Sequence, residues 1–110
     1  MVHITITATG YQHELDQCQW VRMDIGAEAP IVGAHTRCGG SVVLSMHTGE
    51  VVDLRGQGLD GRYVVTDGLD AHAGDDASVA TTGMNATVIL QTCYPVSDGR
   101  ERLVGLEHQG

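Results

Sequence analysis

The sequence predicts a mainly β fold, a small closed β-barrel with short loops and at most one short helix. Several short segments alternate apolar and polar residues, and they follow one another closely along the chain. The 15 glycines, against 2 prolines, indicate many tight turns rather than long helices. Apolar residues make up 42% of the chain and aromatic residues 4%, so the core is expected to be aliphatic. A length of 110 residues suits one domain, so we expect residues 1–110 to fold as a single unit.

The expected elements are short throughout. Residues 3–8 alternate strictly between apolar and polar side chains, which predicts a half-buried first strand. Further strands are expected at residues 31–34, 41–46, 50–54, 62–66, 86–92 and 102–106. Turn-rich stretches lie at residues 56–61, 67–76 and 94–99, and only residues 12–22 could carry a helix of any length. Short strands at this spacing favour a mainly antiparallel barrel or sandwich.

Residues 56–61, with the sequence GQGLDG, match the G-x-G-x-x-G pattern of dinucleotide-binding sites. That pattern binds a pyrophosphate only where a strand precedes it and a helix follows it in a βαβ unit. Here the β-forming residues 62–65 come next, so the stretch is expected to be a glycine-rich hairpin connection.

The charge of the chain excludes some classes of partner. The chain has fourteen acidic residues and six basic ones, all of them arginine, which gives a net charge of −8. No basic patch is available for a phosphate backbone, so we expect no nucleic-acid partner. No apolar run is long enough to span a membrane, and the first residues lack the pattern of a signal peptide. We therefore expect a chain without a membrane segment or anchor of its own.

The three cysteines, Cys18, Cys38 and Cys93, are an odd number, so at least one thiol is unpaired within the monomer. We expect no disulfide framework, which directs attention to a reactive or metal-bound thiol. His35 and Cys38 are spaced like half of a zinc site, which Cys18 or Cys93 could complete, but the chain offers no second C-x-x-C or H-x-x-x-H arm. We therefore predict no metal, and a small zinc-stabilised binding domain remains an alternative.

Cys93 is the most informative of the three cysteines. It ends a β-forming apolar run, and Pro95 then directs the chain out of the strand. A short connection leads to a strand that begins at Arg102, so a hairpin would place Cys93 opposite a cation. Arg100 follows Gly99 in the turn, which favours Arg102 as the rigidly held arginine. Cys93 is therefore expected to be the most reactive thiol.

Residues 88–93, with the sequence VILQTC, resemble the T-L-x-T-C motif that ends in the nucleophile of the sortases, bacterial cysteine transpeptidases of the cell surface. The run Cys93-Tyr94-Pro95 is similar to the continuation of that motif in some sortase classes. Arg102, followed by Leu-Val, resembles the arginine that opens the last sortase strand, and His35 resembles the catalytic histidine although an alanine separates it from Gly33. The resemblance covers about residues 31–106.

The resemblance implies a sortase-like barrel that cleaves a peptide sorting signal through a thioester and transfers it to an amine on a protein or on the cell wall. Cys93 would be the nucleophile, His35 the acid and base, and Arg102 the donor to the oxyanion. Thr92 and Tyr94 would contact the substrate, and no cofactor is implied. The implied location is the outer face of a bacterial membrane, while the missing anchor leaves a cytoplasmic or phage-encoded origin open. A non-catalytic sortase-like interaction protein is the alternative.

Overall fold

The computed structural model describes residues 1–72, 74–95 and 98–109. Within these ranges the chain forms eight strands, two short α-helices and two 3-10 helices. The strands are β1 (Val2–Thr5), β2 (Ala8–Thr9), β3 (Val21–Met23), β4 (Ile31–Gly33), β5 (Val51–Arg55), β6 (Gly61–His72), β7 (Val88–Cys93) and β8 (Arg100–His108). The helices are α1 (Gln12–Asp16), η1 (Thr36–Cys38), η2 (Gly40–Ser45) and α2 (Ala77–Ala80). In this part of the chain, no helix has the length and apolarity needed to cross a bilayer.

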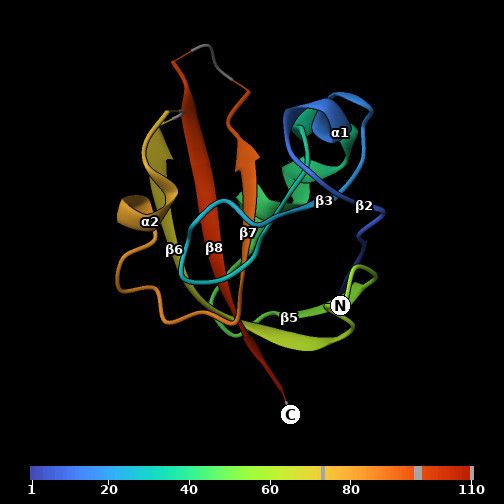
Figure 1. Cartoon of the computed structure of the whole chain (residues 1–110). Helices are drawn as coiled ribbons and strands as arrows, with labels where there is room; N and C mark the ends of the chain where they lie inside the picture. The colour runs from blue at the N-terminus through green and yellow to red at the C-terminus, as the bar shows by residue number, and fades with distance from the viewer. Residues whose placement is uncertain (73, 96–97, 110) are drawn as a thin grey trace.

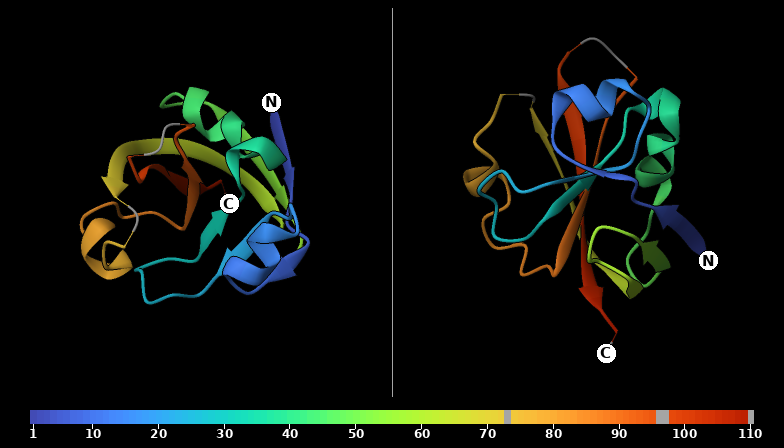
Figure 2. Two further views of the ribbon diagram at one scale, coloured as in Figure 1. Left: turned by 90° about the horizontal axis from the view of Figure 1, so that it is seen from above. Right: turned by 45° about the vertical axis from the view of Figure 1, so that its right-hand side comes forward.

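All eight strands belong to one sheet in the order β1-β5-β6-β8-β7-β4-β3-β2. The sheet curls strongly into an open half-barrel (Figures 1 and 2). The mainly β prediction is confirmed, but the closed barrel is wrong. Over the described residues, β1 and β2 are the two edges, and the chain joins them covalently through Ile6 and Thr7 rather than by pairing them. Four of the pairings observed there are antiparallel and three are parallel.

The core consists of two aliphatic clusters, one on each face of β7 and β8. Val88, Leu90 and Val104 belong to the first cluster, which η2 covers with Val43. Ile89 and Leu103, at the alternate positions, belong to the second cluster, where α1 and α2 pack. In the view of Figure 1, α2 lies to the left and α1 to the right of β7 and β8. The expected aliphatic core is confirmed, with Tyr63 as the one aromatic residue among the buried members described.

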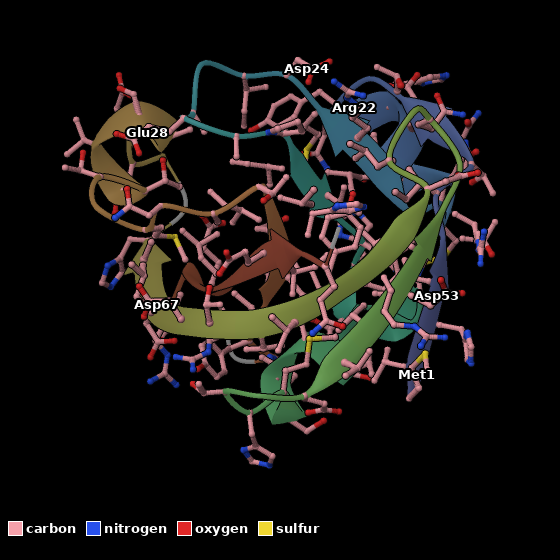
Figure 3. All side chains as sticks on the ribbon, turned by 90° about the horizontal axis from the view of Figure 1, so that it is seen from below. Met1, Arg22, Asp24, Glu28, Asp53 and Asp67 are labelled. Atoms are coloured by element: carbon pink, nitrogen blue, oxygen red, sulfur yellow. A yellow bond between two sulfur atoms is a disulfide. The ribbon has the colours of Figure 1, made fainter. Side chains whose placement is uncertain are left out.

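The surface carries the acidic excess. Figure 3 shows side chains filling the inside of the curved sheet, while Asp24, Glu28 and Asp67 lie on its periphery. Asp53 lies on the outside of β5, where Arg55 is 3.3 Å from it. Asp24, Glu28 and Asp67 are exposed, so their charge contributes to solubility more than to the stability of the fold, whereas the side chain of Asp53 is only 14% exposed.

Four elements differ from the prediction. Residues 41–46 were expected as a strand but lie almost wholly in η2, because Gly39 adopts a left-handed φ of 102° and turns the chain into a helix that packs over the sheet. The predicted helix 12–22 ends at Asp16, and β3 occupies its last part. Residues 67–72 extend β6 beyond a bulge instead of forming a turn, and α2 makes a second short α-helix. The GQGLDG stretch is the predicted hairpin connection between β5 and β6.

A disulfide joins Cys18 to Cys38, with Cα atoms 5.0 Å apart. This bond was not predicted, because the sequence led us to expect no disulfide framework; an odd number of cysteines nevertheless leaves room for one pair and one free thiol. Cys93 is the free cysteine, and it is exposed. Because Cys38 is oxidised, its half of the suggested zinc pattern with His35 is not available to a metal.

Candidate active site

His35 and Cys93 lie at the same end of the sheet, because Cys93 is the last residue of β7 and His35 comes just after the neighbouring parallel strand β4. In the register of β4 and β7, Gly33 is paired with Gln91, so His35 and Cys93 each come two residues further on. The hydroxyl of Thr36 donates a hydrogen bond to the carbonyl oxygen of Cys93. The structure thus brings the predicted nucleophile and the predicted acid–base residue to one place, from positions far apart in the sequence.

Thr92 ties these two segments together. Its side chain is fully buried, and its hydroxyl donates a 2.8 Å hydrogen bond to the carbonyl oxygen of Ala34. Gly40 packs so closely against this pair that no side chain would fit there. Thr92 therefore links the backbone just before His35 to the backbone just before Cys93, and so holds these two residues in position. This corrects its predicted role, because a side chain with no exposed surface cannot contact a substrate.

His35 and Cys93 open onto a cavity of about 340 Å³. Its apolar wall comes from the second core cluster, with Leu15 from α1, Ile31 from β4 and Leu103 from β8. An apolar cavity with a few polar groups at its rim is the usual form of a site for a small molecule or a peptide side chain.

An acidic group and an amide flank Cys93 inside the cavity. Glu101 is its partner in the register of β7 and β8, and the Gln91 amide nitrogen lies 3.0 Å from the Glu101 carboxylate and 4.0 Å from the Cys93 sulfur. Burial raises the pKa of the Cys93 thiol, and the Glu101 carboxylate raises it further. At rest the sulfur is thus held as a thiol, so its activation requires a base. Sequence reasoning missed both Gln91 and Glu101.

The expectation that Cys93 would lie opposite a cation is wrong. The register pairs Arg102 with Thr92 and Cys93 with Glu101. Successive residues of a strand point to opposite faces, so Arg100 and Arg102 project away from the face on which Glu101 lines the cavity. β8 also begins at Arg100, two residues before the predicted start.

Arg102 and Tyr94 belong to a separate polar cluster around Asp70. The Arg102 guanidinium lies 3.3 Å from the Asp70 carboxylate, and the Tyr94 hydroxyl donates a 2.7 Å hydrogen bond to the same oxygen. Arg100 stacks on the Tyr94 ring at 4.2 Å. The hydrogen bond from Tyr94 is the largest of the effects that lower the pKa of Asp70, and Arg102 adds to it. Among the described residues that line the cavity, neither Arg102 nor Tyr94 is found.

Asp16, at the end of α1, contacts the His35 ring. The Nε2 atom of His35 lies 2.8 Å from a carboxylate oxygen of Asp16. Hydrogen bonds from His35 and then from the Gln12 amide hold the pKa of Asp16 below its usual value. The sequence offered no signal for this contact, because it depends on where a five-residue helix packs.

The comparisons with known proteins agree with this geometry at the level of the fold. No protein-family model matches the chain, and no curated protein matches its sequence. A solved structure, sortase C from Clostridium perfringens SM101, superposes on 96% of the chain with a TM-score of 0.68. The chain has a sortase-like fold. Its sequence is 17% identical to that sortase, and it spans 63% of the sortase C chain. The resemblance predicted from residues 31–106 is thereby confirmed at the level of the fold, and the structural match covers nearly the whole chain.

Proposed function

We propose that this chain is a cysteine transpeptidase of the sortase type, in which Cys93 is the nucleophile and His35 the acid–base residue. The observation that carries the proposal is that a free, exposed thiol and an imidazole open onto one cavity from the ends of two paired strands. A sortase-like fold with the thiol at the end of β7 supports the same assignment.

The reaction begins with transfer of the Cys93 proton to His35, because burial and Glu101 hold the sulfur in its thiol form. The thiolate attacks a peptide carbonyl, and His35 returns the proton to the nitrogen that leaves. The resulting thioester is resolved by an amine, which makes a new amide and regenerates the thiol. The expected substrates are a peptide sorting signal and an amine on a protein or on the cell wall, with no cofactor.

Two side chains, Arg102 and Gln91, are candidates for the hydrogen-bond donor that stabilises the oxyanion. Arg102 is proposed from the sequence resemblance, and to act it would have to leave Asp70 and reach around the end of the sheet. The Gln91 amide already lies beside the sulfur within the cavity. Deleting one oxyanion donor typically costs about a hundredfold in rate. Comparing Arg102→Ala, Gln91→Ala and the matched control Arg100→Ala therefore assigns this role.

The disulfide supports the proposed location outside the cytoplasm. Structural disulfides form and persist in oxidising compartments, whereas cytosolic thiols are kept reduced. The outer face of a bacterial membrane meets this requirement, and it is also where a sorting peptide and a cell-wall amine would be available.

A non-catalytic peptide-binding protein is the second candidate. It is favoured by the raised pKa of Cys93 and by the engagement of Arg102 with Asp70 on the other face. Such a protein would hold a peptide in the cavity without forming a thioester.

Incubation with a peptide library and hydroxylamine, followed by mass spectrometry, distinguishes the two. The transpeptidase forms hydroxamate products and an acyl adduct on Cys93, both absent in Cys93→Ala and lost in His35→Ala. Product formation that is equal in Cys93→Ala would overturn the proposal. Peptide binding with no adduct at any pH would favour the binding protein.

A further inference from the structure

We propose that Asp16 is the positioning residue for His35, and that the Cys18–Cys38 disulfide holds it in place. This inference rests on the proposed function, since it assigns how the acid–base residue is oriented. Its basis is the 2.8 Å contact between His35 Nε2 and the Asp16 carboxylate, next to a disulfide that links the same two segments.

The contact fixes which nitrogen of His35 carries a proton. Asp16 has a lowered pKa, so it is ionised at neutral pH and its oxygens can only accept hydrogen bonds. Nε2 must therefore be the donor. Nδ1 is left as the nitrogen that takes the proton from the Cys93 sulfur and returns it to the leaving nitrogen, while the Nε2 proton stays in place throughout. The carboxylate also faces the imidazolium that exists between these two transfers, which stabilises it.

Asp16 would be poorly held without the disulfide. Its side chain is 59% exposed, and it ends a helix of five residues, which is too short to be stable alone. Cys18 follows Asp16 by two residues, and Cys38 follows His35 by three. The bond between them therefore fastens the end of α1 beside η1, and Figure 2 shows these helices next to each other. Among the described residues, the other hydrogen bond to Asp16 comes from Gln12 within the same helix, which cannot fix the helix to His35. The positive charge of Arg37 in η1 also attracts Asp16, but it adds no hydrogen bond.

The test is the tautomer of His35, read from the ring nitrogen shifts by NMR. The full chain is expected to show a proton on Nε2, and Asp16→Asn is expected to lose that preference and at least roughly tenfold in kcat, with little change in KM. Asp16→Glu should restore part of both. Glu14→Gln is the matched control, because it removes an equal charge from the same helix. The Glu14 carboxylate accepts a hydrogen bond from the Tyr11 backbone N–H and does not contact His35.

The role of the disulfide is tested in the same measurement. Cys18→Ser/Cys38→Ser is expected to reproduce the tautomer and rate changes of Asp16→Asn, and adding Asp16→Asn to it should cause no further loss. An unchanged tautomer and kcat in Asp16→Asn would overturn the inference. A full additional loss in the triple variant would overturn the part assigned to the disulfide. Equal activity of Cys93→Ala would instead overturn the proposed function, while the tautomer shifts would still decide whether Asp16 orients His35.

Discussion

Removing the Cys18–Cys38 disulfide should lower the free energy of unfolding by about 3 kcal/mol. The two cysteines are 20 residues apart, and the chain-entropy relation for a loop of that size gives this value at 25 °C. The loop they close includes β3 and β4, so the constraint acts on strands that carry His35 to its place. In a chain of 110 residues, a loss of this size corresponds to a fall in Tm of roughly 10–15 °C.

Urea unfolding of Cys18→Ser/Cys38→Ser, compared with the oxidised chain, measures this loss. Cys93→Ser in both backgrounds prevents thiol exchange during the experiment, and equal m-values would show that the unfolded states are comparable. Thiol titration of the unsubstituted chain should find one reactive group in the folded state and three after reduction. A loss below about 1 kcal/mol, or three free thiols in the native protein, would refute the reasoning.

Three further outcomes are expected. Glu101→Gln should lower the pKa of Cys93, because it removes the carboxylate that raises it, and alkylation by iodoacetamide at neutral pH should become faster. The control Glu107→Gln, on the same strand, should leave the alkylation rate unchanged. Slower alkylation of Glu101→Gln would contradict the electrostatic assignment. Thr92→Val should cost about 1–3 kcal/mol in urea unfolding because the Ala34 carbonyl loses its buried partner, and Thr92→Ser should recover most of it. Leu54→Ala should cost about 2–5 kcal/mol through a cavity in the first cluster, and a loss under 1 kcal/mol would show that this core repacks.

Sequence reasoning identified the strand ends that build the site. The β-forming run before Cys93 and the short strand before His35 were both evident as patterns, and the parallel pairing of these strands places the two residues at the same end of the sheet. The same reasoning failed for Arg102, because which residue of β8 faces Cys93 depends on the register of the hairpin, and neither the strand pattern nor the loop sequence specifies it.

Other features depended on tertiary packing. Residues 41–46 have the composition of a strand, but the chain turns at Gly39 and packs η2 over the first cluster. The disulfide joins segments that are far apart in the sequence, so cysteine counting alone could not reveal it. Asp16 looked like any surface carboxylate until the position of α1 was known.

The register of β7 and β8 has a consequence for how related chains should be compared. Cys93 has a carboxylate beside it only because β8 presents Glu101, and not one of the arginines on either side of it, to the cavity. A slip of one residue would exchange the carboxylate for a guanidinium without altering a single amino acid. Two homologues with the same acidic and basic residues in this hairpin can therefore present opposite charges to this cavity. Pairing partners, rather than aligned columns, decide which charge lines it.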